Sequence, residues 1–122
     1  MSKKVLIVED EPNILTSLRF ILERSGFDVE VDTNGRTAHD RIMKTPPDVL
    51  VLDVMLPGMD GFEILRSIRE SDLTRNLPVL MLTAKGQRED RNNAIELGAD
   101  LFITKPFSND EVVDAIMSLS GE

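Results

Sequence analysis

Five short runs of large apolar residues recur along this chain, and they constrain its fold more than any other feature of the sequence. The runs are Val5–Val8, Val29–Val31, Val49–Leu52, Val79–Leu82 and Leu101–Ile103. All except the second are uninterrupted apolar blocks, the pattern expected of parallel strands that are covered by helices on both faces. In the second run the valines alternate with acidic residues, and this alternation predicts a strand at the edge of the sheet.

Segments with the apolar spacing of amphipathic helices separate these runs. Their apolar faces fall within Ile14–Leu22, Ala38–Met43, Phe62–Ile68, Ala94–Leu97 and Val112–Leu119. Gly26 stops the first helix and Pro46 the second. Ser108 begins the last one, where it supplies a capping box with Glu111. The fourth helix begins in an almost wholly polar stretch, Gln87–Asn93, which predicts that it is weakly anchored to the core.

The order of elements is therefore strand and helix repeated five times, (βα)5. Right-handed crossovers between parallel strands place helices on both faces of an open sheet. This predicts an α/β fold of three layers, a doubly wound parallel sheet. The chain of 122 residues can bury the core of one domain and leaves no room for a second of ordinary size, so residues 1–122 are expected to form a single domain. The absence of cysteine excludes disulfides, thiolate metal sites and cysteine nucleophiles.

The charge balance narrows the range of partners. Fourteen Lys and Arg against twenty-two Asp and Glu give a net charge of −8, which disfavours direct binding to nucleic acid or to an anionic membrane. No apolar run approaches the roughly 20 residues of a membrane span, and the first residues carry no cleavage site of a secretory signal. We therefore expect a cytoplasmic protein whose partners are other proteins, small ions or cationic groups.

The predicted strands end in polar residues that can bind ions or react. The first strand ends in Glu9-Asp10, the third in Asp53, the fourth in Thr83 and the fifth in Thr104-Lys105. In open parallel sheets, ligands bind beyond the carboxyl ends of the strands, near the point where the strand order reverses. A single polar strand end is common, but four at one edge of a sheet predict a functional site.

The chemistry of these residues predicts a cation and an anion side by side. Glu9, Asp10 and Asp53 would bring carboxylates within a few ångströms of one another, where like charges raise a pKa or require a counterion. Mg2+ suits a site that offers few direct carboxylates together with phosphate and water. Lys105 adds a positive charge and Thr83 a hydroxyl donor, so an anion is expected between them. If Asp53 attacked a phosphorus atom, Mg2+ and Lys105 would neutralise the transferring oxygens, as phosphoryl transfer requires.

Four segments together resemble the successive sequence motifs of the receiver domain of bacterial two-component response regulators. The segments are VLIVEDE, LVLDVMLPGMDG, PVLMLTAKG and GADLFITKPF, and the similarity extends over essentially the whole chain. The resemblance implies a flavodoxin-like fold with strand order 2-1-3-4-5 and a histidine kinase that phosphorylates Asp53. It also implies a Mg2+ site formed by Glu9, Asp10, Asp53 and the backbone carbonyl of Met55.

The same resemblance assigns roles to further residues. Thr83 matches the hydroxyl that binds the phosphoryl group, and Lys105 matches the lysine that pairs with it. Phe102 falls at the aromatic switch position three residues before that lysine, and Pro106 suggests a cis Lys105–Pro106 bond. The phosphoryl donor would be a sensor histidine kinase or a histidine phosphotransfer protein. The switched state would reach an effector protein through the face formed by the fourth helix, the fifth strand and the fifth helix.

Two departures from the family pattern concern the output of the signal. The winged-helix branch of regulators usually carries two acids after Gly-Ala and an arginine in the fifth helix, whereas this chain has Asp100-Leu101 and Asp114-Ala115. These departures count against the salt-bridged dimer of that branch. Leu101 instead makes the output face more apolar, which suits a different protein as partner. The chain ends at Glu122, near the expected end of the fifth helix, so it is either a stand-alone receiver or a fragment of a longer regulator.

Other interpretations of these residues are weaker. A phosphatase of the haloacid-dehalogenase type also forms an aspartyl phosphate beside Mg2+, but its second acid would stand where Met55 cannot donate a proton. A P-loop needs GxxxxGK[ST] and a flavodoxin a Ser/Thr-rich loop after the first strand, and the sequence has neither. His39 is expected to be a surface residue without a role. We expect the chain to be a phosphoryl-accepting switch with at most slow self-dephosphorylation, and not an enzyme. Met55 and Lys85 would flank the approach of the attacking water and so influence the lifetime of the phosphoryl group.

Overall fold

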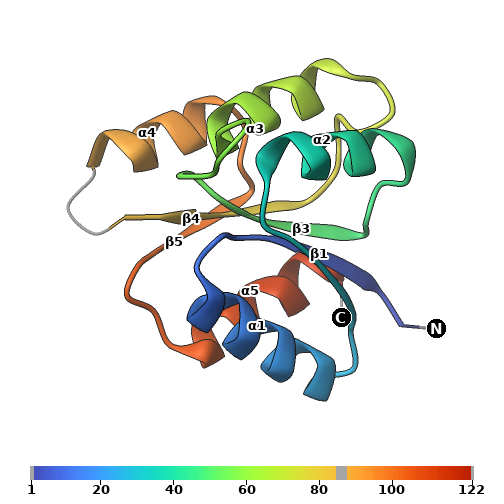
Figure 1. The fold of residues 1–122 in the computed structure, drawn as a ribbon, viewed down its shortest axis with the longest axis vertical. Coiled ribbons are helices and arrows are strands. Elements are labelled where there is room, and N and C mark those ends of the chain that lie inside the picture. The colour runs from blue at the N-terminus through green and yellow to red at the C-terminus, as the bar shows by residue number, and fades with distance from the viewer. Residues whose placement is uncertain (1, 85–87, 122) are drawn as a thin grey trace.

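The computed structural model describes residues 2–84 and 88–121, which alternate between strands and helices (Figure 1). In chain order the elements are β1 (Lys4–Val8), α1 (Pro12–Arg24), β2 (Asp28–Asp32), α2 (Gly35–Lys44), β3 (Val49–Asp53), α3 (Gly61–Glu70), β4 (Val79–Thr83), α4 (Arg88–Glu96), β5 (Leu101–Thr104) and α5 (Asn109–Ser120). This is the predicted (βα)5 order, and each strand contains the apolar run assigned to it. None of the helices in the described part of the chain has the length and apolar character needed to span a bilayer.

All five strands are parallel and lie in the order β2-β1-β3-β4-β5, as the resemblance implied. The chain runs from β1 to one neighbour and then crosses to the other, so the strand order reverses at β1 and β3, where such sheets bind ligands. Val8 of β1 is level with Leu52 of β3, and Thr83 of β4 is level with Thr104 of β5. The residues that follow these positions therefore leave the sheet at one edge.

Helices cover both faces of the sheet, and each central strand supplies side chains alternately to two cores. α2, α3 and α4 lie on one face, and α1 and α5 lie on the other (Figure 1). Leu50 and Leu52 of β3 face the first group of helices, while Val49 and Val51 face the second. Every residue of β3 and β4 is buried, which explains why their sequences are uninterrupted apolar blocks.

Local sequence explains several helix boundaries. Ser108 caps α5 and exchanges hydrogen bonds with Glu111, as the predicted capping box requires. A second capping box, formed by Asp60 and Glu63, begins α3. The apolar residues in the sequence predict this helix but do not predict its cap. Beyond the end of α1, Gly26 has a φ of +98°, a left-handed conformation that glycine adopts without steric cost.

Two elements are less buried than the sequence predicts. β5 is the second edge of the sheet and its Leu101 is 38% exposed, so the prediction that this strand is covered on both faces is wrong. Ile95, predicted to lie on the apolar face of α4, is 57% exposed, because Ala94 occupies the side of the helix that meets the core. The burial of Ala94 alone among the α4 residues agrees with the weak anchoring expected of this helix. Gln87, assigned to the same segment, lies outside the described residues.

Candidate functional site

The carboxyl edge of the sheet gathers the polar residues that follow or end the strands. Glu9 and Asp10 follow β1 and Asp53 ends β3, and a carboxylate oxygen of each lies within 4.8 Å of the other two. Thr83 ends β4, and Lys105 follows β5. The structure thus brings all five predicted residues to one edge, because parallel strands in register end together.

Lys105 reaches across this edge to the carboxylates. Its Nζ lies 3.1 Å from Oε2 of Glu9 and 3.3 Å from Oδ1 of Asp53. Its backbone N–H donates to the carbonyl of Thr83 at 2.7 Å, and its bond to Pro106 is cis, as the resemblance implied. Lys105 is therefore held to β4 by its backbone and to the acidic residues by its side chain.

Burial and neighbouring charges shift the pKa values of this cluster. Glu9 is fully buried, and burial together with the charge of Asp53 raises its pKa to about 7. Burial also raises the pKa of Asp53, although the Lys105 ammonium opposes the shift. Burial by itself would lower the pKa of Lys105, but attraction to the Asp53 and Glu9 carboxylates outweighs it and the pKa is raised. The lysine therefore stays charged, and two buried carboxylates share it.

The acidic cluster fits a further cation. Three carboxylates against one ammonium leave an excess of two negative charges (3 − 1) when all are ionised. Oε2 of Glu9 is buried and accepts no hydrogen bond of acceptable geometry from the described residues, although the Lys105 ammonium is near. Carboxylate oxygens are ligands of hard cations, so this donor set fits Mg2+. Met55, whose carbonyl the resemblance assigns to the same site, lies two residues after Asp53 in the loop toward α3.

The two residues expected to transmit the signal lie at the end of β4 and in β5. Thr83 is fully buried, and its hydroxyl lies 3.2 Å from that of Thr104. Phe102 is half-buried and packs against the core on the α4 side of the sheet. The guanidinium of Arg91 lies over the Phe102 ring, 4.7 Å from its centroid, and forms a cation–π contact. This contact joins α4 to β5, and no pattern in the sequence indicates it.

Comparison with known proteins assigns this arrangement to a family. A sequence model of the response regulator receiver domain matches residues 5–117. The chain belongs to the response regulator receiver family. It is similar to the alkaline phosphatase synthesis transcriptional regulatory protein PhoP of Bacillus subtilis, with 47% identity over 112 residues, which are 92% of this chain and 46% of that protein. This receiver chain spans about half the length of the curated relatives it matches.

Solved structures of other receiver domains share the fold. A response regulator from Chloroflexus aurantiacus superposes with a TM-score of 0.94 at 34% identity, over 100% of both chains. The receiver domain of a sensor histidine kinase from Pseudomonas aeruginosa superposes with a TM-score of 0.90 at 28% identity, also over 100% of both chains. That structure holds a magnesium ion in its active-site cleft. The flavodoxin-like fold predicted from the motifs is confirmed.

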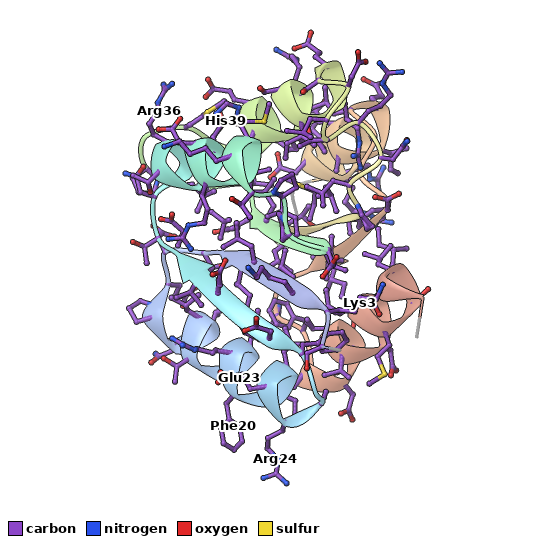
Figure 2. All side chains as sticks on the ribbon, turned by 90° about the vertical axis from the view of Figure 1, so that its right-hand side faces the viewer. Lys3, Phe20, Glu23, Arg24, Arg36 and His39 are labelled. Carbon is purple, nitrogen blue, oxygen red and sulfur yellow. The ribbon has the colours of Figure 1, made fainter. Side chains whose placement is uncertain are left out.

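This receiver domain also contains polar contacts that the sequence does not indicate. His39, expected to be a surface residue without a role, lies on α2 (Figure 2). Its Nε2 lies 2.7 Å from Oγ of Ser67, so the histidine joins α2 to α3. Its side chain is only 19% exposed, because neighbouring helices on one face of the sheet cover it. Lys85, expected to influence the phosphoryl lifetime, lies outside the described residues.

Arg69, near the end of α3, is a second polar centre of this kind. Its guanidinium donates to the carbonyl oxygens of Leu77 at 2.7 Å and Gly98 at 2.9 Å. It also donates to the carboxylate of Asp100 at 3.0 Å, which in turn accepts from the backbone N–H of Val79 at 2.8 Å. The Arg69 side chain is 18% exposed, and it ties the beginnings of β4 and β5 to α3.

Proposed function

We propose that this receiver domain accepts a phosphoryl group on Asp53 in a Mg2+-dependent reaction, and that phosphorylation changes a surface that binds other proteins. The position of the Asp53 carboxylate carries the proposal. It ends a fully buried central strand, it lies beside the carboxylates of Glu9 and Asp10, and the Lys105 ammonium is 3.3 Å away. A carboxylate nucleophile that lies beside both a positive charge and further cation ligands meets the requirements of phosphoryl transfer.

In the proposed step, a carboxylate oxygen of Asp53 attacks the phosphorus of a phosphohistidine on a sensor kinase or a histidine phosphotransfer protein. The O–P bond forms as the N–P bond breaks, and the released imidazole keeps the electron pair and takes a proton from water. Lys105 stabilises the charge on the transferring oxygens, and the Thr83 hydroxyl donates to one of them. When bound, Mg2+ supplies further charge neutralisation. Its ligands would be Glu9, Asp10, Asp53 and the carbonyl of Met55.

The proposed signal leaves the site through Thr83. When its hydroxyl turns toward the phosphoryl group, it leaves space into which Phe102 can move. Arg91 follows, because its guanidinium lies over the Phe102 ring, and α4 shifts relative to β5. An effector protein then binds the altered face formed by α4, β5 and α5. Ile95 and Leu101 are exposed apolar residues on this face, of the kind that protein partners cover.

We further propose that the domain is a switch and not an enzyme that turns over. Where an aspartate-based phosphatase has its proton donor this chain has Met55, so the aspartyl phosphate is hydrolysed at most slowly. The proposed phosphoryl donor receives its phosphoryl group from ATP, so we place this receiver domain in the cytoplasm. We also assign all 122 residues to one receiver domain. The net charge of −8 supports proteins rather than nucleic acids as its direct partners.

Phosphorylation by acetyl phosphate tests this proposal. With Mg2+, the wild-type chain should take up one phosphoryl group that is stable in acid and released by hydroxylamine, and Asp53→Asn should take up none. Asp28→Asn changes an exposed aspartate at the start of β2 and should be labelled like wild type. Strong labelling of Asp53→Asn, or labelling that persists in excess EDTA, would contradict the proposal. Many turnovers per chain would favour the phosphatase.

A further inference from the structure

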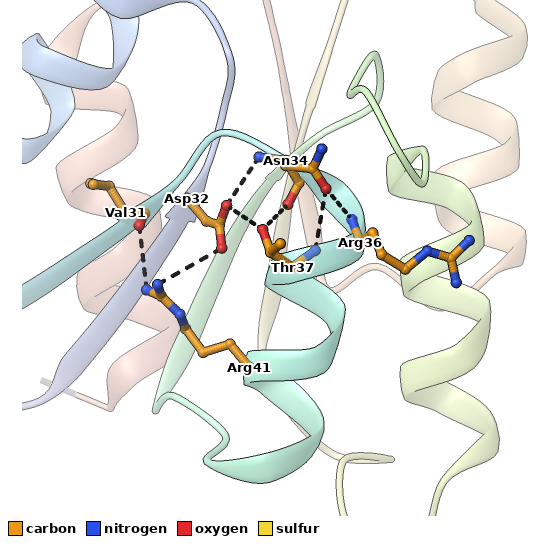
Figure 3. Close-up of polar contacts among 6 residues, drawn as sticks. All are labelled: Val31, Asp32, Asn34, Arg36, Thr37 and Arg41. Carbon is orange, nitrogen blue, oxygen red and sulfur yellow. Dashed lines mark hydrogen bonds and ion pairs between the residues drawn. The ribbon is translucent and has the colours of Figure 1, made fainter.

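The turn between β2 and α2 lies outside the proposed site, and a network of polar contacts fixes its shape (Figure 3). Asn34 caps α2, and its side-chain oxygen accepts from the backbone N–H groups of Arg36 at 2.8 Å and Thr37 at 3.2 Å. Asp32, at the end of β2, accepts from the backbone N–H of Asn34 at 3.0 Å and from the Thr37 hydroxyl at 2.8 Å. The turn and the first residues of α2 are therefore bonded to the last residue of β2.

Arg41, further along α2, adds a second connection to the same strand (Figure 3). Its guanidinium donates to the carbonyl of Val31 at 3.3 Å and lies 3.8 Å from the carboxylate of Asp32. The Asp32 side chain is only 10% exposed, whereas the Arg41 side chain is 43% exposed, so the contact is shielded from water on the side of Asp32 alone. α2 is thus held to the end of β2 both at its N-terminus, through Asn34 and Thr37, and in its last turn, through Arg41.

This turn packs directly against the loop between β3 and α3. The backbone N–H of Gly35 donates to the carbonyl of Pro57 at 2.9 Å, and a Cβ on Gly35 would overlap the carbonyl oxygen of Met59. At Gly58, whose φ is +83°, a Cβ would lie 2.7 Å from the side-chain oxygen of Asn34. Glycine is needed on both sides of the contact, because the turn and the loop approach too closely for a side chain.

The same loop is anchored to β3 at its far end. The backbone N–H of Gly61 donates to the carbonyl of Val54 at 2.9 Å, and a Cβ on Gly61 would overlap the carbonyl oxygen of Asp53. Met55 lies in the segment that this anchor closes. The segment that contains Met55 is therefore fixed on one side at Val54, by Gly61, and on the other at Pro57, by Gly35.

We propose that Gly35 and Asn34 are positioning residues for the cation site, because they brace the loop at Pro57–Met59 and so orient the backbone carbonyl of Met55. This inference rests on the proposed function, in which that carbonyl is a ligand of Mg2+. Mg2+ needs near-ideal octahedral geometry at about 2.0–2.1 Å, whereas Ca2+ accepts irregular geometry at about 2.3–2.6 Å. A small displacement of the loop should therefore weaken the binding of Mg2+ more than the binding of Ca2+.

Replacing Gly35 by alanine forces such a displacement. We expect Gly35→Ala to raise the dissociation constant of Mg2+ about tenfold, because the loss of a group that orients a metal ligand commonly has an effect of this size. The dissociation constant of Ca2+ should rise by less than about threefold. Both constants are measured by isothermal titration calorimetry on the full chain with each metal chloride alone. The matched control is Gly26→Ala, which is strained by a φ of +98° but has nothing within 4 Å of its Cβ. It should destabilise the fold and leave both dissociation constants unchanged.

A second variant keeps the test decisive if Gly35→Ala does not fold. Asn34→Ser retains a capping oxygen for α2 but shortens the side chain that closely approaches Gly58. It should therefore lower the ratio of Mg2+ to Ca2+ affinity in the same direction. An unchanged ratio in Asn34→Ser and in folded Gly35→Ala would overturn the inference and leave the proposed function intact. An equal loss in Gly26→Ala would also overturn it, because general destabilisation would then explain the effect. A wild-type chain that binds no Mg2+ at millimolar concentration would refute the cation site and both proposals together.

Discussion

Replacing Glu9 by glutamine should stabilise the metal-free receiver domain above neutral pH, although it removes a residue of the proposed cation site. The Glu9 carboxylate is fully buried, and its Oε2 accepts no well-formed hydrogen bond from the described residues. Burial and the charge of Asp53 raise the pKa of Glu9 from 4.5 to about 7. The folded protein therefore resists ionisation of this group, whereas glutamine has nearly the same shape and no charge.

The two pKa values determine the sign, the size and the pH range of the effect. Between pH 4.5 and 7 the folded state keeps a proton on Glu9 that the unfolded state has released, so the free energy of unfolding falls as the pH rises. A pKa difference of 2.5 (7 − 4.5) corresponds to about 3 kcal/mol, at about 1.36 kcal/mol per unit. Below pH 4.5 the wild-type chain should match Glu9→Gln in stability, and above pH 7 it should be less stable by up to this amount.

Urea unfolding in EDTA at pH 4.5 and pH 8.5, followed by far-ultraviolet circular dichroism, measures this difference. The chain lacks Trp and Tyr, so fluorescence from those residues cannot report the transition. Glu70→Gln, which alters an exposed glutamate at the end of α3, is the matched control and should change the stability little at either pH. An equal gap between wild type and Glu9→Gln at both pH values would refute the reasoning. So would a Glu9→Gln variant that is less stable than wild type at pH 8.5.

Two further predictions concern the switch and the core. Thr83→Ala should bind Mg2+ nearly as wild type does but lose most of the response of β5 and α4 to beryllofluoride. A ligand shifts the equilibrium between two conformations only if it binds one of them more tightly, and the Thr83 hydroxyl is the proposed source of that difference. Amide chemical shifts measure this response, and a full wild-type shift pattern in the variant would show that the coupling is wrong. Arg69→Ala should lower the free energy of unfolding by about 2–4 kcal/mol. The reason is that the Asp100 carboxylate and the backbone carbonyl oxygens of Arg75, Leu77 and Gly98 lose their donor. In the same urea titration the exposed Arg66→Ala should cost less than about 0.5 kcal/mol, and equal losses in the two variants would contradict this account.

Much of the fold and of the site depends on local sequence, and the sequence alone determined these parts. A run such as Val49–Leu52 predicts a buried parallel strand, because a strand covered on both faces has no polar side. The capping box of Ser108 locates the start of α5, because its hydrogen bonds join residues three positions apart. Asp53 and Lys105 could be assigned to one edge before any packing was known, because parallel strands deliver the residues at their carboxyl ends to the same edge.

Properties that arise from contacts between distant residues were decided only by the tertiary structure. The pKa of Glu9 rises because the folded chain removes water from it and brings Asp53 near. Gly35 is needed because its backbone meets that of Met59, and neither segment's own sequence indicates the other. Leu101 belongs to an apolar block like those of the central strands, yet it is partly exposed because β5 is an edge of the sheet. The physical reason is the same in each case: burial and charge environment are set by what packs against a residue, and its sequence neighbours do not contain that information.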